Sequence, residues 1–229
     1  MSANIISAYN DYYTKSQLVH VYPVEFVVRT FLGRYPNLAL DKSNYIDKRI
    51  LDLGYGDGRN MPLLFNLGFK VFGVEISDEI NQATKNRLQA LDIPAELKTG
   101  HNANIPFPDN YFQTILACHA CYYVAEGQTF TDNLNEINRV LEENGMFVCS
   151  LPFRDSYILE NADVLSDGHF RIKNDPYHLR NGTIFRAFND EEEIKQTLND
   201  YFTDFRIGFC NDNFYGIHQK VWIVTCWKK

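Results

Sequence analysis

A short glycine-rich turn flanked by acidic residues is the part of the sequence best suited to bind a small polar ligand. The turn follows the β-rich run 49–53 and opens a helical pattern, and its glycines are Gly54, Gly56 and Gly58. Residues without a side chain let a ligand approach the backbone, and the helix start presents N–H groups to it. Asp52, just before the turn, can orient a cationic amino group.

A second carboxylate follows the next β-rich run. Glu75 ends residues 70–74, and a carboxylate at that position can accept hydrogen bonds from both hydroxyls of a ribose. It would also repel the 2′-phosphate of NADP. The Gly-x-Gly-x-Gly spacing differs from the Gly-x-Gly-x-x-Gly of dinucleotide binders, which hold a pyrophosphate. The tighter turn favours a smaller ligand with an amino-acid end.

The elements that carry these residues alternate between β-rich runs and helical patterns. Seven strands are expected at about residues 49–53, 70–74, 95–99, 111–117, 146–151, 205–210 and 221–227, with a polar loop joining the last two. Helices are expected at about 59–67, 77–91 and 190–202, and another from about residue 134 that is closed by Asn144 and Gly145. This alternation predicts a doubly wound α/β fold with a mostly parallel sheet.

Two segments fall outside the alternation. Residues 1–45 read as one or two helices and are expected to form an N-terminal helical lid. Residues 153–187 are polar, aromatic and irregular, and are expected to form a substrate-selecting insert. In a doubly wound fold both can lie over the carboxyl ends of the strands, where ligands bind.

Three ordered motifs resemble the class I S-adenosylmethionine-dependent methyltransferases. They are Ile-Leu-Asp-Leu-Gly-Tyr-Gly-Asp-Gly at 50–58, Val-Glu at 74–75, and Ile-Pro-Phe-Pro-Asp-Asn-Tyr-Phe at 105–112. The loop at 56–60 is also similar to that of tellurite-resistance and thiopurine methyltransferases, and the motifs fit the type 11 group. The resemblance covers about residues 48–152. It implies one domain over 1–229, with a Rossmann-like seven-stranded mixed sheet, helices on both faces and an antiparallel last strand.

The resemblance also implies the cofactor, S-adenosyl-L-methionine, and the product, S-adenosyl-L-homocysteine. The glycines would then lie beneath the methionine portion, Glu75 would hold the ribose, and Ile76 would pack on adenine. The family often has an Asp before the Pro-Phe motif to bind the adenine amino group, and here His101 or Asn102 would replace it. The expected cofactor-binding residues are Asp52, Gly54, Gly56, Gly58, Asn60, Glu75, Ile76, His101, Asn102, Ala103 and Cys118.

The end of the fourth strand is the expected place for chemistry. His119 is the candidate general base, because its unperturbed pKa of about 6.5 is close to working pH. The alternative is a pocket-wall or hydrogen-bonded structural histidine, since many enzymes of this family use no base. The expected substrate contacts are Tyr12, Tyr13, Tyr122, Tyr123 and His169, each with packing or a solvated loop as the alternative.

Cys118 and Cys121 form a Cys-x-x-Cys pair, but the chain has no second pair or matching histidines with zinc-ligand spacing. No metal is therefore expected. The formal net charge of −7 and the lack of basic runs argue against a nucleic-acid partner. No apolar stretch approaches the roughly 20 residues that span a bilayer, and no signal peptide is visible, so no membrane partner and a cytoplasmic location are expected.

The function indicated is methyl transfer to O, N or S of a small-molecule acceptor by in-line displacement. Two alternatives remain open at this point: a protein that binds S-adenosylmethionine without transferase activity, and a nicotinamide-dependent oxidoreductase on the same sheet. The sequence does not specify the acceptor or the oligomeric state.

Overall fold

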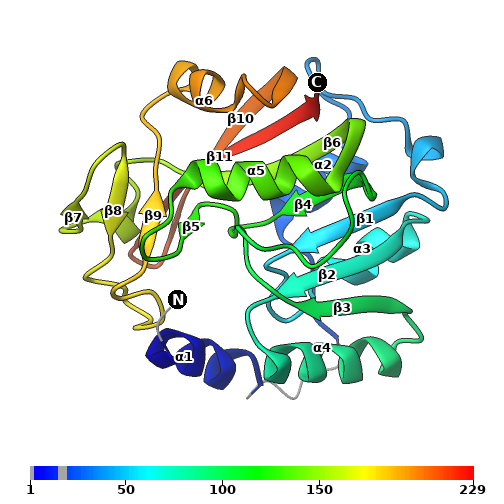
Figure 1. Cartoon of the computed structure of the whole chain (residues 1–229), viewed down its shortest axis with the longest axis horizontal. Coiled ribbons are helices and arrows are strands. Elements are labelled where there is room, and N and C mark those ends of the chain that lie inside the picture. Colours follow the sequence, from blue (N-terminus) through cyan, green and yellow to red (C-terminus); the bar gives the residue numbers. More distant parts are fainter. Residues whose placement is uncertain (1–2, 15–19) are drawn as a thin grey trace.

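A seven-stranded sheet forms the centre of the molecule in the computed structural model, which describes residues 3–14 and 20–229 (Figure 1). Its order is β3-β2-β1-β4-β6-β11-β10. The strands are β1 (Arg49–Leu53), β2 (Lys70–Glu75), β3 (Ala95–Thr99), β4 (Phe112–Ala117), β6 (Leu141–Pro152), β10 (Phe202–Phe214) and β11 (Ile217–Lys228). The strand β11 runs antiparallel to both of its neighbours, β6 and β10, and all other neighbouring strands of this sheet pair in parallel. The predicted doubly wound mixed sheet with an antiparallel last strand is confirmed.

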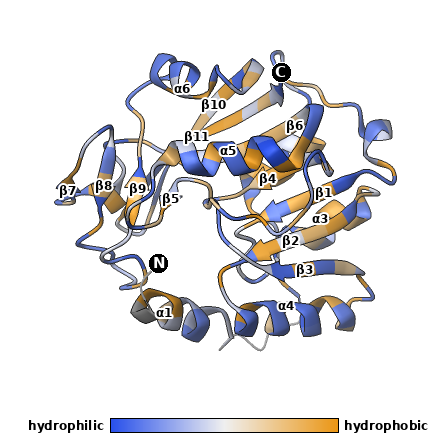
Figure 2. Cartoon of the chain, in the orientation of Figure 1, coloured by the Kyte–Doolittle hydropathy of each residue, from blue (hydrophilic) through white to orange (hydrophobic). Residues whose placement is uncertain are grey.

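Helices cover both faces of this sheet. The helices α2 (Glu25–Leu32), α3 (Met61–Asn66) and α4 (Asp78–Ala90) bury apolar side chains in one core, and α5 (Phe130–Val140) and α6 (Glu191–Leu198) do so in the other. Figure 2 shows the strands β1, β2 and β4 as the apolar centre between these layers. The described α-helices run from 6 to 13 residues, and not one has the length and apolar character that a bilayer crossing requires.

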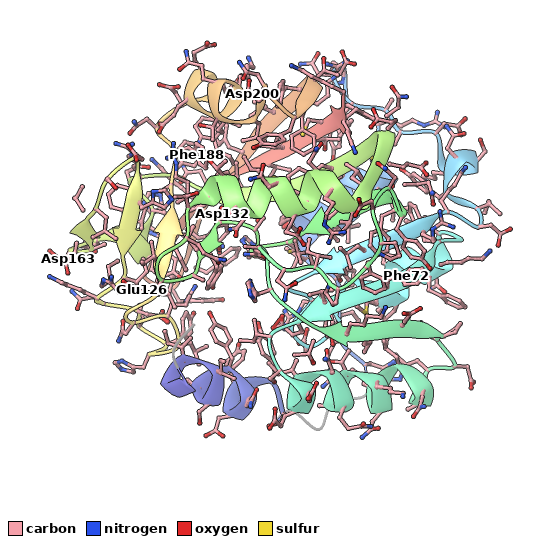
Figure 3. The ribbon with its side chains drawn as sticks, in the orientation of Figure 1. Phe72, Glu126, Asp132, Asp163, Phe188 and Asp200 are labelled. Carbon is pink, nitrogen blue, oxygen red and sulfur yellow. The ribbon has the colours of Figure 1, made fainter. Side chains whose placement is uncertain are left out.

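The insert is more regular than the sequence predicted. Its strands β7 (Asp163–Val164), β8 (His169–Arg171) and β9 (Ile184–Arg186) join β5 (Tyr123–Val124) in a small antiparallel sheet of order β5-β9-β8-β7. A 3₁₀ turn, Tyr157–Leu159, precedes them. Figure 3 shows Asp163 and Glu126 at this side of the molecule, and Phe188, just after β9, close to the start of α5. Strands of two or three residues leave too short a pattern for the sequence to reveal.

Two element boundaries also differ from the predictions. The helix α5 ends at Val140, and residues 142–145 are a bulge in β6, because Leu141 already pairs with Phe112 of β4. The expected polar loop between the last two strands is instead a continuous hairpin, closed by Tyr215 and Gly216. Both turn residues have positive φ, 51° and 96°, which is typical of the tight turns that match the twist of paired strands.

The N-terminal segment divides into two parts with different positions. The helix α2 buries Phe26, Val27 and Phe31 in the core, so residues 25–45 are not part of a lid. The helix α1 (Ala3–Thr14) lies beside α4 at the carboxyl edge of the sheet (Figure 1). The Ser77 hydroxyl, which caps α4, also forms a hydrogen bond with Asn10 Oδ1. Residues 1–2 and 15–19 of the expected lid lie outside the described residues.

Candidate active site

The glycine turn lies between β1 and α3, and close packing around it explains why side chains are absent. Gly54 and Gly56 have φ of 67° and 57°, a region that L-residues with side chains rarely adopt. A Cβ atom at Gly54 would lie 2.5 Å from Cβ of Ala120, in the loop after β4. A Cβ atom at Gly56 would lie 2.7 Å from the ring of Tyr13. The turn is therefore covered by the α1 helix on one side and by the β4 loop on the other.

Asp52 is fully buried directly below this turn, and both of its carboxylate oxygens lack a hydrogen-bond partner among the described residues. Burial, with further contributions from Glu75 and Asp57, raises the pKa of Asp52 to about 8. A buried carboxylate without a donor is costly, so such groups are concentrated at functional sites. Asp52 is thus available to accept hydrogen bonds from a ligand, and a cationic ligand would satisfy both its hydrogen bonds and its charge.

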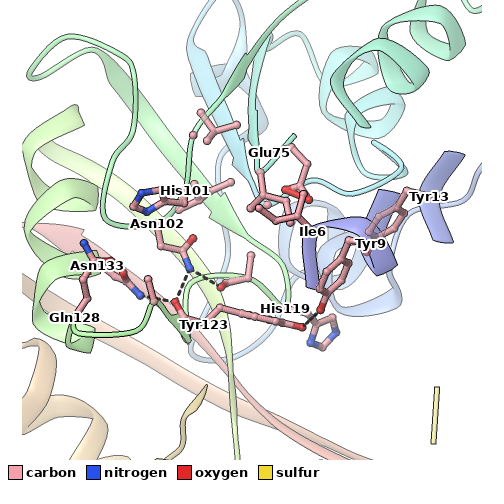
Figure 4. Close-up of a pocket in the computed structure, with 17 residues that line it drawn as sticks. Ile6, Tyr9, Tyr13, Glu75, His101, Asn102, His119, Tyr123, Gln128 and Asn133 are labelled. Atoms are coloured by element: carbon pink, nitrogen blue, oxygen red, sulfur yellow. Dashed lines mark hydrogen bonds between the residues drawn. The ribbon is translucent and has the colours of Figure 1, made fainter. Parts of the chain in front are cut away.

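Glu75 lies one strand away, at the carboxyl end of β2, and its side chain is directed into a cavity (Figure 4). Burial raises the pKa of Glu75 to about 8, although a hydrogen bond from the Ile76 backbone N–H partly opposes the effect. Asp52 and Glu75 therefore place two buried carboxyl groups at this edge. The edge favours a ligand that brings positive charge and several hydrogen-bond donors.

The first cavity extends from Gly54 along the ends of β1 and β2 to the α5 helix. Glu75, Ile76 and Asn102 line its inner side, and Ile6 and Tyr9 of α1 close its outer side (Figure 4). Asn102 Nδ2 donates hydrogen bonds to the carbonyls of Ala120 and Tyr123, 2.9 and 3.0 Å away, which leaves its Oδ1 as the acceptor. The cavity thus has an acidic end at Glu75 and a partly apolar end, where the amide oxygen of Asn102 can accept a hydrogen bond.

The second cavity lies on the other side of the loop after β4, towards the insert. It is lined by residues of α1, the glycine turn, the β4 loop and the insert, including Asn60, Cys118, Tyr122, Tyr157 and Arg180. The two cavities share the lining residues Tyr9, Tyr13, Gly54, His119 and Tyr123. At the boundary the hydroxyls of Tyr9 and Tyr123 form a 2.9 Å hydrogen bond. Two ligands bound in these cavities would meet beside His119 and this tyrosine pair.

His119 is held at the boundary in an unusual backbone conformation, with φ of 56°. Its backbone N–H donates to Ser150 Oγ at 2.9 Å, and its Nδ1 lies 3.2 Å from the same oxygen. The Ser150 side chain is buried, and among the described residues only Nδ1 is available to accept its hydroxyl proton. Nδ1 is then the acceptor, so the remaining ring nitrogen, Nε2, carries the proton.

The pKa of His119 supports a neutral ring. Burial, with smaller contributions from the nearby positive charges of Arg180 and Arg59, lowers it to about 4. A neutral imidazole with its proton on Nε2 is a hydrogen-bond donor to the cavity. The role of general base expected for His119 stays a prediction, and this tautomer favours a hydrogen-bond donor at the boundary.

The structure brings most of the predicted site residues to one edge of the sheet, where they line two different cavities. Gly54, Glu75, Ile76, His101 and Asn102 line the first cavity, and Asn60, Cys118, Tyr12 and Tyr122 line the second. Gly56 lies under Tyr13, and Gly58 packs against Thr84, so neither lines the first cavity. Ala103 lies outside both cavities.

His169 is also outside both cavities, because it serves the start of α5. Its Nε2 accepts from the Phe130 backbone N–H, 3.3 Å away, and its Nδ1 lies 3.0 Å from the Ser166 carbonyl. Both ring nitrogens are therefore engaged in holding the insert against α5. His169 thus lies outside both cavities, and its expected contact with a substrate stays a prediction.

Several lining residues were not predicted from the sequence. Gln128 and Asn133, near the start of α5, line the first cavity, and Tyr157, Tyr177 and Arg180 of the insert line the second. Asn133 is buried and donates from Nδ2 to the carbonyls of Cys121 and Tyr123. A polar residue on the apolar face of a predicted amphipathic helix was the available signal for Asn133. The insert residues follow no motif.

Comparison with known proteins identifies the central part of the chain. Residues 51–149 match the sequence model of a family described as a methyltransferase domain. This match spans β1 to β6, which includes the glycine turn, Glu75 and the β4 loop. No curated protein sequence matches the chain.

Solved structures with the same fold cover most of the molecule at low sequence identity. The structure of 1,6-didemethyltoxoflavin-N1-methyltransferase from Burkholderia thailandensis, with 1,6-didemethyltoxoflavin and S-adenosylhomocysteine bound, is 17% identical over 99% of this chain and 86% of its own, with a TM-score of 0.64. A SAM-dependent methyltransferase from Methanosarcina mazei is 19% identical over 86% and 99%, with a TM-score of 0.59. One from Aquifex aeolicus is 16% identical over 90% and 94%, with a TM-score of 0.53.

Proposed function

Because residues 51–149 match the model of a methyltransferase domain and the fold is that of S-adenosylmethionine-dependent methyltransferases, we propose that the chain is such an enzyme and transfers a methyl group to an O, N or S atom of a small molecule. The observation that carries this proposal is the buried carboxyl group of Asp52 at the glycine turn, which has no hydrogen-bond partner among the described residues. A ligand with a positively charged donor would satisfy it, and S-adenosylmethionine has an ammonium group at its amino-acid end. The cofactor supplies an activated methyl group on a sulfonium sulfur.

The residues of the first cavity, together with Asp52 buried beneath the glycine turn, fit the parts of this cofactor. Asp52 would accept from the ammonium group, and Glu75 would accept from the two ribose hydroxyls. Ile76 would pack on the adenine ring, and Asn102 Oδ1, which is left free by the hydrogen bonds of its amide nitrogen, would accept from the adenine amino group. The tight turn at Gly54 would let the amino-acid end approach the backbone.

The second cavity is the proposed acceptor site. Its boundary with the first cavity is formed by Tyr9, Tyr123 and His119, so an acceptor bound there would be oriented towards the methyl group. Orientation of this kind supplies about 7–11 kcal/mol of a bimolecular barrier. His119 would donate a hydrogen bond from Nε2 to the acceptor. The Burkholderia enzyme holds a small heteroaromatic molecule together with S-adenosylhomocysteine, which supports a small acceptor here.

Calorimetry with S-adenosylhomocysteine, combined with a turnover assay, tests the proposal. We expect S-adenosylhomocysteine to bind and NAD to show no heat. Glu75→Ala removes two hydrogen bonds to a charged acceptor, each of about 1.5–3 kcal/mol, so the affinity should fall at least about 100-fold. Glu79→Ala, on the exposed first turn of α4, is the control and should bind like the wild type.

Three results would count against the proposal, and each would exclude a different part of it. Unchanged affinity in Glu75→Ala would exclude the ribose assignment. Tight NAD binding would indicate the oxidoreductase alternative. Cofactor binding without formation of S-adenosylhomocysteine from S-adenosylmethionine, across a broad panel of oxygen, nitrogen and sulfur nucleophiles, would indicate a binding protein.

A further inference from the structure

The second cavity contains a guanidinium group whose counter-ion lies behind it. Arg180, from the insert, lines the cavity, whereas its partner Asp175 does not. The two side chains are joined by Nε and Nη2 of Arg180, which donate to the carboxylate at 3.0 and 2.7 Å. The Asp175 side chain has no exposed surface, whereas that of Arg180 is 19% exposed. The ion pair is therefore oriented with its positive end towards the cavity.

Asp175 is committed to the loop that carries Arg180. Besides the guanidinium, it accepts from the backbone N–H groups of Tyr177, Leu179 and Arg180. These hydrogen bonds consume the capacity of the carboxylate and fix the loop at 175–180. Nη1 of Arg180, in contrast, has no hydrogen-bond partner among the described residues, while Nη2 also reaches Tyr157 Oη at 3.2 Å. Arg180 therefore keeps an unused N–H group in a preorganised position.

The other cation that lines this cavity, Arg59, is paired with a carboxylate in the same wall. Arg59 donates to both carboxylate oxygens of Asp57, at 2.9 and 2.7 Å, and both residues line the cavity together. Their charges cancel at the cavity wall. The unbalanced positive end is thus that of Arg180, and its field reaches the boundary, where it acts on His119 and lowers the pKa of that residue.

Flat aromatic faces surround the guanidinium. The ring centroids of Tyr157 and Tyr177 lie 6.0 and 5.6 Å from Cζ of Arg180, and Tyr122 and Tyr123 line the opposite wall with stacked rings 5.1 Å apart. Tyrosine walls favour planar molecules, because rings stack on them with little loss of side-chain freedom. The cavity combines these walls with a single inward cation.

We infer that the acceptor of this enzyme is a planar aromatic molecule that carries an anionic oxygen group, and that Arg180 is the residue that selects it. The inference rests on the proposed function, since it assigns the acceptor class of the same site. A carboxylate, phenolate or enolate oxygen would accept from Nη1 of Arg180, and such a charge-assisted hydrogen bond is stronger than one between neutral groups. The ring of the acceptor would stack between tyrosines.

A matched pair of probes tests this inference by calorimetry on the protein saturated with S-adenosylhomocysteine. The probes are 2-naphthoate and 2-naphthamide, which share a flat ring and differ in charge. We expect the wild type to bind 2-naphthoate at least 10-fold more tightly than the amide. Arg180→Gln should bring the two affinities to within 2-fold of each other, and Arg180→Lys should retain a reduced preference for the anion.

Arg171→Gln is the control, because Arg171 lies in the same insert and pairs with the exposed Glu126 but lines neither cavity. It should keep the wild-type preference. Equal binding of both probes by the wild type, binding of neither, or a preserved preference in Arg180→Gln would overturn the inference. Should Arg180→Gln not fold, full wild-type preference in Arg180→Lys would count against the forked contact that the inference requires. Failure of S-adenosylhomocysteine to bind at the outset would instead refute the proposed function.

Discussion

Binding of S-adenosylhomocysteine at pH 7 should release protons, and Asp52 should be one of their sources, beside Glu75. With a pKa of about 8 in the free protein, Asp52 holds ~0.9 of a proton at pH 7. An ammonium group against this carboxylate favours the ionised form and lowers its pKa by several units, so the bound state holds almost none. The amino group of S-adenosylhomocysteine is already protonated at pH 7 and takes up no further proton. The release from Asp52 is therefore about 0.9 of a proton.

Calorimetric titrations in buffers of different ionisation enthalpy measure this number directly, because the observed heat varies linearly with the buffer enthalpy and its slope is the proton count. Asp52→Asn keeps the shape of the side chain and cannot titrate, so its slope should be lower than that of the wild type by about 0.9. Asp92→Asn is the control: Asp92 is exposed and has a positive φ of 55° that asparagine also tolerates.

Two results would refute the reasoning. A wild-type heat that does not depend on the buffer would mean that Asp52 is already ionised in the free protein, or that it stays protonated when the ligand is bound. An unchanged slope in Asp52→Asn would mean that the protons come from another group, of which Glu75 is the nearest candidate with a raised pKa.

Three further predictions concern stability, turnover and the glycine turn. The folded protein keeps the Asp52 proton up to about pH 8, whereas the unfolded chain loses it near pH 3.9. Asp52 should therefore lower the free energy of unfolding by about 1.4 kcal/mol per pH unit between pH 5 and 7, and Glu75, whose pKa is also about 8, should contribute a similar slope. Urea titrations of Asp52→Asn should show a slope reduced by about 1.4 kcal/mol per pH unit. His119→Ala should lower kcat at least about 10-fold and change the Kd of S-adenosylhomocysteine less than about 2-fold, because His119 faces the acceptor; wild-type turnover would make it a wall residue. Gly56→Ala should destabilise the turn by about 1–2 kcal/mol and weaken cofactor binding in calorimetry. Adding Tyr13→Ala should recover part of the affinity, because it removes the clash but not the strain at positive φ. Unchanged affinity in the single variant would contradict the close approach of Tyr13 to Gly56.

The central part of the fold could be predicted because its information is local. The strands β1, β2 and β4 are short, mostly apolar runs, the glycine turn follows β1 directly, and Ser77 caps α4 at the start of the helix expected from residue 77. Parallel strands then bring the ends of β1 and β2 to one edge, so the position of Asp52 near Glu75 followed from the topology alone.

The second cavity could not be predicted because its parts come from distant segments with weak patterns. Tyr9 and Tyr123 are joined across 114 residues, and no periodicity relates them. Arg180 lies in a loop whose shape is fixed by the side chain of Asp175, so its direction depends on hydrogen bonds that no residue spacing encodes. His119 was correctly placed at the end of β4, but its role depends on Ser150, which lies on the neighbouring strand β6.

The opposite charges of the two cavities couple the ligands that they bind. The first cavity has buried carboxyl groups that become anionic when a cationic ligand pairs with them, and the second has the positive end of the Arg180 pair. An anionic acceptor next to a sulfonium gains attraction in a region of low effective dielectric, whereas the sulfur of S-adenosylhomocysteine is neutral. An acceptor of the inferred class should therefore bind more tightly beside S-adenosylmethionine, or an unreactive sulfonium analogue, than beside S-adenosylhomocysteine. A coupling free energy of 1–3 kcal/mol is typical of such linked sites, and by reciprocity the same acceptor should tighten the sulfonium ligand by the same factor in calorimetry. Equal acceptor affinity beside both ligands would mean that the boundary at Tyr9 and Tyr123 screens the two charges from each other.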